Sequence, residues 1–186
     1  MSASDAIRSR RSIKRFIERP VTREEIETLL AAATLAPNHR LTNPWRFYVL
    51  GPEARYAYGL ALGERKAKKI ENPDAARATR EAVAAEHRAL PVMIAVAVVD
   101  NENPEIREED YAAAMMAVQN IMLTAVELGL GTHLKTGGVM SDPAARAAVG
   151  LPQNERIVAV VNVGVPAEIP PSKKREDAAA LTTWVP

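Results

Sequence analysis

Two uninterrupted apolar runs constrain the fold of this chain more than any other feature of its sequence. The first, PVMIAVAVV, covers residues 91–99, and the second, RIVAVVNVGVP, covers residues 156–166. Both are shorter than the ~20 residues that a bilayer crossing needs. Their length and β-branched content predict strands that are buried on both faces. A sheet built on such strands needs helices on either side of it.

Helical patterns occupy most of the remaining sequence. Thr22 and Glu25 have the spacing of a capping box, and Pro37 ends the helix that follows them. A third strand, WRFYVL, is expected over residues 45–50. Other helices are expected over residues 4–10 with Ser4 as the N-cap, twice within 52–90 with a break near Asn72, and from Pro143 in a short segment. A long buried helix is expected over 108–128: it opens on the acidic run 108–110, carries Tyr111 on its apolar stripe, and is ended by Gly129 and Gly131.

Three strands among many helices, without regular βαβ alternation, favour an α+β layered fold over a doubly wound one. A length of 186 residues with 47% apolar residues fits one domain covering residues 1–186. The tail PPSKKRED, residues 170–177, is polar and is expected to form an exposed arm.

Composition excludes several classes of function. The chain has no cysteine, which removes disulfides and thiolate catalysis and is compatible with a reducing cytoplasm, where we expect the protein to reside. The net charge of +1 argues against a nucleic-acid binder. The three histidines have no metal-site spacing, and no secretory signal or membrane span is apparent. Residues 1–90 hold 17 Lys and Arg against 11 Asp and Glu, so this half suits an anionic ligand.

The stretch SRRSIKRF, residues 9–16, gathers cations around one hydroxyl group. Arg10, Arg11, Lys14 and Arg15 surround Ser12. Guanidinium groups can donate several hydrogen bonds to phosphate oxygens, and a serine hydroxyl can add another. Taken alone, this stretch could be either a solvated basic edge or an anion pocket.

Two further stretches could bind a ligand. APNHRLTNPWRFYV, residues 36–49, is a polar loop between a buried helix and a strand, which suits the edge of a polar heterocycle. GLGTHLKTGGV, residues 129–139, combines a lysine, a hydroxyl and permissive glycines, as a second phosphate clamp would. The chain lacks the dinucleotide-binding glycine fingerprint, the Walker loop and the common hydrolase motifs.

Together and in this order, the three stretches resemble the nitroreductase family of flavoproteins, especially its short members. The resemblance covers nearly the whole chain. It implies an α+β sandwich with a small, mostly antiparallel central sheet, an intertwined homodimer, and FMN at the dimer interface. It also implies FMN contacts for seven residues: Arg10, Arg11 and Ser12 at the phosphate and ribityl chain, Leu134, Lys135 and Thr136 as further contacts on the phosphate side, and His39 from the other subunit.

The sequence departs from the family pattern at several positions. Asn43 stands where relatives often carry glutamine, Lys135 where they carry arginine, and Leu134 where close relatives carry tryptophan. Leu41 occupies a position that is often polar. A lysine still supplies charge to a phosphate, so these changes affect the surroundings of the flavin ring more than the phosphate clamp.

The function implied by the resemblance is an FMN-dependent oxidoreductase. Non-covalently bound FMN would take hydride at N5 from NAD(P)H and reduce a nitroaromatic or quinone by a ping-pong mechanism. No side chain is expected to be an obligatory acid or base, and no metal is expected. Two alternatives remain: a flavin-binding, flavin-processing or sensor protein without turnover, and a helical interaction protein whose basic half binds an acidic partner.

Overall fold

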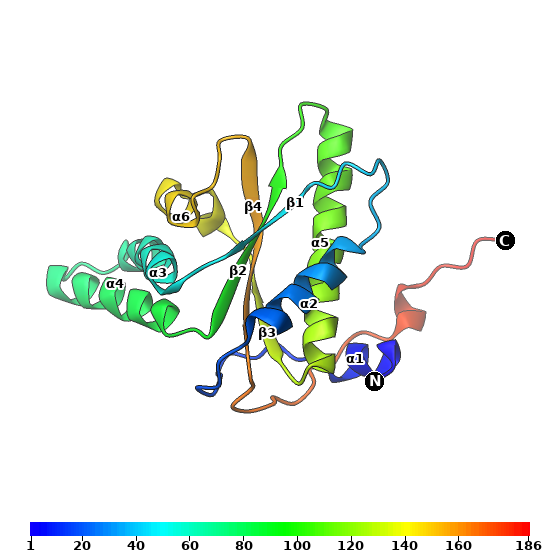
Figure 1. The fold of residues 1–186 in the computed structure, drawn as a ribbon, viewed down its shortest axis with the longest axis horizontal. Coiled ribbons are helices and arrows are strands. Elements are labelled where there is room, and N and C mark those ends of the chain that lie inside the picture. The colour runs from blue at the N-terminus through cyan, green and yellow to red at the C-terminus, as the bar shows by residue number, and fades with distance from the viewer.

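The computed structural model describes all 186 residues and places a four-stranded antiparallel sheet between two layers of helices (Figure 1). The strand order across the sheet is β1-β2-β4-β3, and every neighbouring pair is antiparallel. The strands are β1 (Trp45–Val49), β2 (Val92–Val99), β3 (Gly131–Lys135) and β4 (Glu155–Gly164).

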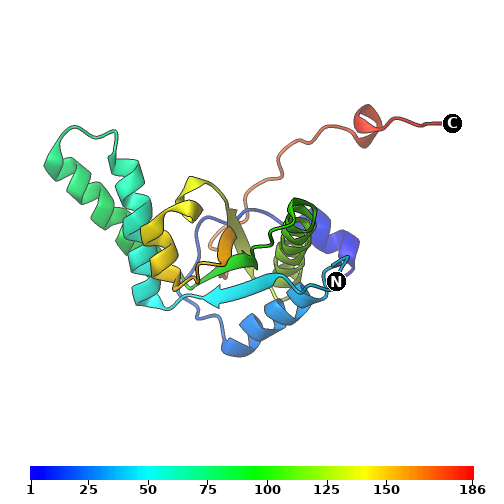
Figure 2. The same cartoon turned by 90° about the horizontal axis from the view of Figure 1, so that it is seen from above.

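The helices divide between the two faces of the sheet (Figures 1 and 2). On one face lie α2 (Arg23–Thr34) and α5 (Pro104–Glu127), with α1 (Ala3–Ser9) packed on α5. On the other face, α3 (Pro52–Ala67) contacts α6 (Pro143–Val149), and α4 (Pro73–Arg88) packs on α3. Short 3₁₀ turns occupy Gly138–Ser141 and Ala178–Leu181. No helix combines the length and the apolar composition that a bilayer crossing requires.

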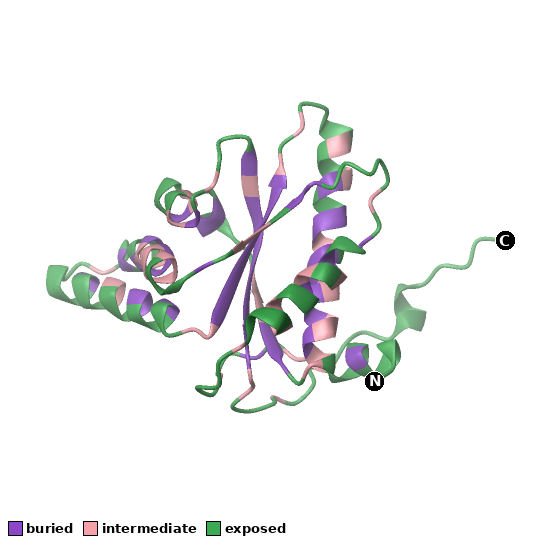
Figure 3. Ribbon diagram, in the orientation of Figure 1, coloured by how far each residue is buried: buried purple, intermediate pink, exposed green.

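The two apolar runs form the central strands, as predicted (Figure 3). Alternate residues of β2 enter different cores. Ile94 and Val96 belong to the apolar cluster shared with α2 and α5, whereas Met93 and Ala95 belong to the cluster shared with α3 and α6. Both sides of the strand are therefore covered, which explains why it carries no polar residue.

Most helix ends follow the sequence signals. The Thr22–Glu25 capping box is present, Asn72 caps α4, and Pro143 is the first residue of α6. Two predicted starts are wrong. The first helix begins at Ala3 and is capped by Ser2, and α5 begins one turn early, at Pro104. The acidic run 108–110 therefore lies inside α5, where it is free to pair with another element.

The strand β3 is not predicted by the sequence pattern. Gly131 is expected to help end the long helix, but it is the first residue of this edge strand, which pairs with β4 from Gly131–Gly164 to Lys135–Val160. The segment is five residues long, and His133 and Lys135 give it little strand character. Its position beside β4 is decided by tertiary packing.

Candidate functional site

The basic N-terminal segment lies along the outer edge of β3. Ser12 forms an isolated parallel bridge with Thr132, and the Ile13 amide donates to the Thr132 carbonyl at 2.8 Å. The Ile13 side chain is buried against Gly131, where an added Cβ would lie 2.5 Å from Ile13 Cγ1. Backbone pairing and one buried side chain thus fix the position of the cations on either side of Ile13.

A cavity of about 590 Å³ lies between this segment and the C-terminal arm, a volume in the usual range for ligand sites. It is strongly basic, because six of its lining side chains are Lys or Arg and only Glu168 is acidic. The lining residues are Ile7, Arg8, Arg10, Arg11, Ser12, Lys14, Glu168, Pro170, Pro171, Ser172, Lys173 and Arg175.

None of these six cations has an acidic partner within the chain. None of them takes part in any of the ten salt bridges. Arg11 differs, since its Nη1 donates to the carbonyls of Arg8 and Arg10. Its Nε is buried without a partner. Unpaired cations around one cavity fit a dianionic group such as a phosphomonoester.

The residues of the third predicted stretch lie elsewhere on β3. Leu134 packs with the apolar cluster beneath α5, and Thr136 is exposed just beyond the strand. Lys135 points to the opposite face, where its Nζ lies 3.3 Å from Nε2 of His87 on α4. None of the three lines the basic cavity. The structure therefore brings together Arg10, Arg11 and Ser12. It places Leu134, Lys135 and Thr136 further along the same edge of the sheet.

One more cation, Lys135, lies further along that edge, next to the imidazole of His133. His133 and Lys135 share one face of β3 because side chains alternate along a strand. Burial lowers the pKa of His133, and the charges of Lys135 and Lys14 lower it further. Burial likewise lowers the pKa of Lys135. Lys14 belongs both to the cavity and to the surroundings of His133, so positive potential extends from the cavity to Lys135.

The buried imidazole of His87 and the half-buried imidazole of His133 make stability dependent on pH. Burial lowers the pKa of both His87 and His133, so the unfolded chain binds protons that the folded chain does not. The free energy of unfolding should be highest above the ordinary imidazole pKa of 6.5 and fall as the pH drops to about 5. Urea unfolding across this range should show the decline. The double variant H87Q/H133Q should lose most of it, whereas H39Q, which removes an exposed imidazole, should keep it.

The loop that carries His39 is tied to the beginning of α5. His39 Nδ1 lies 2.9 Å from Glu109, Arg40 Nε donates to the same carboxylate at 2.8 Å, and Thr42 donates to the buried Asp110. Leu41 and Asn43 both have positive φ, so the loop needs these contacts to hold its shape.

This loop does not reach the basic cavity of its own chain. The cavity adjoins α1 and β3, and β3 follows the far end of α5 (Figure 1). Glu109 lies in the second turn of α5, and the helix ends only at Glu127, so most of its length separates the loop from β3. His39 can therefore join Arg10 and Ser12 only through a second copy of the chain.

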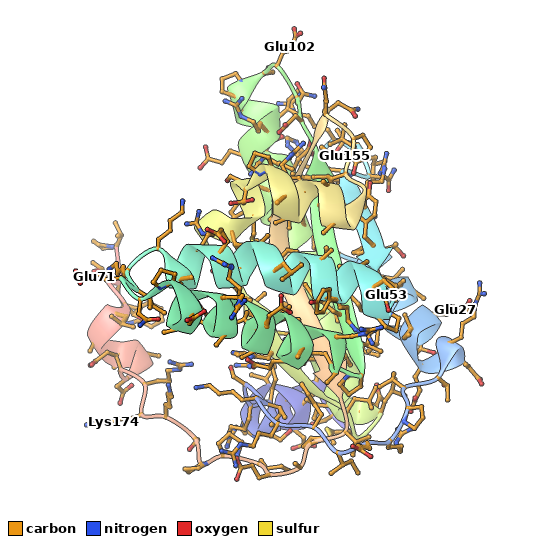
Figure 4. The ribbon with its side chains drawn as sticks, turned by 90° about the vertical axis from the view of Figure 1, so that its left-hand side faces the viewer. Glu27, Glu53, Glu71, Glu102, Glu155 and Lys174 are labelled. Atoms are coloured by element: carbon orange, nitrogen blue, oxygen red, sulfur yellow. The ribbon has the colours of Figure 1, made fainter.

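A larger cavity, of about 730 Å³, lies at the opposite end of the sheet. Its lining mixes acids with two arginines, and Arg156 pairs with Asp100 at 3.1 Å while lying over the ring of Tyr111. Figure 4 shows Glu102, which lines this cavity, at the far end of the molecule from Lys174 of the C-terminal arm. Because Arg156 already has an acidic partner, this cavity is the weaker candidate for an anionic ligand.

Comparison with known proteins identifies the family. The model of the nitroreductase family matches residues 7–165. The chain belongs to the nitroreductase family. A Bacillus subtilis (strain 168) relative named "Putative NAD(P)H nitroreductase YfhC" is 36% identical over 171 residues, which cover 92% of this chain and 88% of that protein. A nitrobenzene nitroreductase from Ectopseudomonas oleovorans is 27% identical over 192 residues, which cover 86% of this chain and 85% of that protein.

Solved structures confirm the α+β nitroreductase fold. A nitroreductase-like family protein from Bacillus cereus superposes with a TM-score of 0.86 at 26% identity, over 100% of this chain and 96% of that one. A protein from Desulfovibrio desulfuricans, crystallised in complex with FMN, superposes with a TM-score of 0.75 at 27% identity, over 100% of this chain and 98% of that one.

Sequence reasoning misses part of the lining of the basic cavity. It assigns Lys173 and Arg175 only to an exposed arm, although they complete the basic cavity. It counts Lys14 among the cations without selecting it as a site residue. The KKR run in the tail is the available signal, yet nothing local indicates that it folds back towards residue 10. The structure contains no cluster of His, Asp or Glu that could hold a metal ion.

Proposed function

We propose that this chain is an FMN-dependent oxidoreductase that takes hydride from NAD(P)H and reduces a small organic acceptor such as a nitroaromatic or quinone. One observation supports this above the rest: unpaired cations from both ends of the chain surround a single cavity. The named NAD(P)H nitroreductase relative and the FMN complex of a structural neighbour agree with it.

Within this proposal, the cavity receives the phosphate of FMN. Arg10, Lys173 and Arg175 neutralise its charge, and Ser12 offers a hydroxyl group. Arg11 ties its own segment together through two backbone carbonyls and thereby aims the neighbouring side chains. Bound FMN supplies hydride transfer between NAD(P)H and the acceptor, while the protein supplies placement and electrostatics. The chain therefore needs no dinucleotide-binding fingerprint of its own.

The seven site residues predicted from the sequence stay a proposal and fall into three groups. Arg10, Arg11 and Ser12 are assigned to the phosphate. The resemblance implies phosphate-side contacts for Leu134, Lys135 and Thr136, but these residues lie along and just beyond β3 and do not line the cavity, so we assign them to the remainder of the cofactor instead. His39 is assigned to the FMN site of the partner subunit, since it lies far from the cavity of its own chain.

A homodimer is part of the same proposal. Beyond the residues that line the cavity, the C-terminal arm extends away from the body, with Trp184 90% exposed and Leu181 and Val185 exposed beside it (Figures 1 and 2). Apolar side chains on an extended arm favour burial against another surface. Light scattering at micromolar concentration should give twice the mass of one chain. A monomer would contradict a shared site.

The central experiment combines an absorbance spectrum with steady-state kinetics. The purified protein should be yellow with about one FMN per chain, should oxidise NAD(P)H, and should give parallel double-reciprocal plots when the acceptor concentration is varied. Stoichiometric FMN without turnover of any acceptor would instead favour the binding or sensor alternative. A colourless protein that takes up no added FMN would overturn the proposal. The cytoplasmic location stays a prediction.

A further inference from the structure

His87, in the last turn of α4, is only 1% exposed, the lowest value among the polar side chains that the fold buries. Its Nδ1 lies 2.7 Å from the carbonyl oxygen of Val83. A carbonyl can only accept a hydrogen bond, so Nδ1 must carry the proton. In the neutral ring, Nε2 then presents a lone pair towards β3.

That lone pair faces the ammonium group of Lys135. The distance between His87 Nε2 and Lys135 Nζ is 3.3 Å. An ammonium group can act only as a donor, so the lysine donates and the imidazole accepts. Burial lowers the pKa of His87, which keeps the ring neutral beside the cation. Lys135 thus donates one N–H to His87, and its other two N–H groups remain available to a ligand.

No carboxylate competes for Lys135, because the lysine takes part in none of the salt bridges of the chain. The other charged groups that act on both side chains are Glu86 and Lys66, whose charges oppose each other. The imidazole of His87 is therefore the group that fixes the direction of the ammonium.

We propose that His87 is a positioning residue that holds the Lys135 ammonium at the edge of β3, where it meets the part of FMN beyond the phosphate. This inference rests on the proposed function. The basic cavity accounts for the phosphate, and the positive edge from Lys14 past His133 to Lys135 is the adjoining surface of the same segment of sheet. An ammonium anchored by a buried acceptor needs no rearrangement when the cofactor binds.

A double-mutant cycle on FMN affinity tests the coupling. Apoprotein is titrated with FMN, and binding is followed by quenching of flavin fluorescence. K135M and H87F should each weaken binding about tenfold, since each removes a charge-assisted contact or its anchor. H87F should add nothing in the K135M background, because His87 acts only through Lys135. H87Q, whose amide oxygen can still accept from Lys135, should stay close to the wild-type affinity.

The flavin midpoint potential supplies a readout that a packing role would not move. Both H87F and K135M should shift it in the negative direction, because a cation that favours the reduced flavin is lost or displaced. V83A is the matched control. It truncates a buried side chain one turn earlier on α4 and leaves the backbone carbonyl in place, so it should lower stability while affinity and potential stay unchanged.

Two outcomes would overturn the inference. One is FMN affinity in K135M or H87F equal to that of the wild type. The other is an equal loss from H87F with and without Lys135. Both presuppose a wild-type protein that binds FMN and oxidises NAD(P)H, so they are distinguishable from failure of the proposed function, in which the wild type itself takes up no flavin.

Discussion

The double variant R10A/R175A is expected to bind FMN at least about 100-fold more weakly than the wild type, because two charge-assisted hydrogen bonds to one phosphate are removed. The two arginines come from opposite ends of the chain, line the same cavity and have no acidic partner. Their charge is therefore available to a ligand. Titration of the apoprotein with FMN measures the loss, and the purified variant should be visibly less yellow.

A matched control separates local charge from net charge. R23A/R77A removes two exposed arginines that pair with acids of their own helices, and it changes the net charge by the same amount. Its FMN affinity should stay within about twofold of wild type, because exposed pairs contribute little. Added salt should weaken the wild type more than R10A/R175A, since fewer cation–phosphate contacts remain to be screened. An R10A/R175A affinity within about threefold of wild type would contradict the phosphate assignment.

The elements that can be predicted from the sequence are those whose environment is uniform along their length. Helices cover both faces of β2, so every residue of the strand is apolar. A continuous apolar run in the sequence is therefore enough to predict that the strand is buried. The long helix α5 is also predicted, but Tyr111, which the sequence pattern places on its apolar stripe, is exposed and lies beneath Arg156. The buried side of α5 centres instead on small residues such as Ala114 and Ala117, which allow close approach to the sheet.

The site is predictable only where its residues are contiguous. Arg10, Arg11 and Ser12 form one segment, so local composition is enough to single them out. Lys173 and Arg175 reach the same cavity from the opposite end of the chain, and no pattern in the tail specifies that return. His87 is unremarkable in a charged, alanine-rich helix. Its importance comes from its burial and from Lys135 opposite it, which are properties of the fold.

Gly131 couples the fold to the site, so replacing it with valine should damage both. Valine suits an edge strand by propensity, which alone would predict a stabilised β3. Packing opposes it, because a Cβ at this position would lie 2.5 Å from Ile13 Cγ1 and 2.9 Å from Pro166 Cγ. We expect G131V to lower the free energy of unfolding by about 2–3 kcal/mol. Urea unfolding of the apoprotein measures this loss of unfolding free energy without any contribution from the cofactor.

The same substitution should weaken FMN binding by roughly 100-fold, a larger effect than its distance from the cavity suggests, because Ile13 anchors the segment that aims the phosphate contacts. G51V is the matched control: Gly51 has extended backbone and no heavy atom within 4 Å of an added Cβ, so FMN affinity should be retained, and stability should fall only by about 1 kcal/mol, the cost of valine at the N-cap of α3. The double variant I13A/G131V should regain part of the FMN affinity lost in G131V, because removing the Ile13 side chain relieves its clash with the valine. I13A alone should lower the stability of the protein. If G131V binds FMN as tightly as G51V does, then the docking of the N-terminal segment on β3 does not position the cations, and the phosphate site must be held by the C-terminal arm alone.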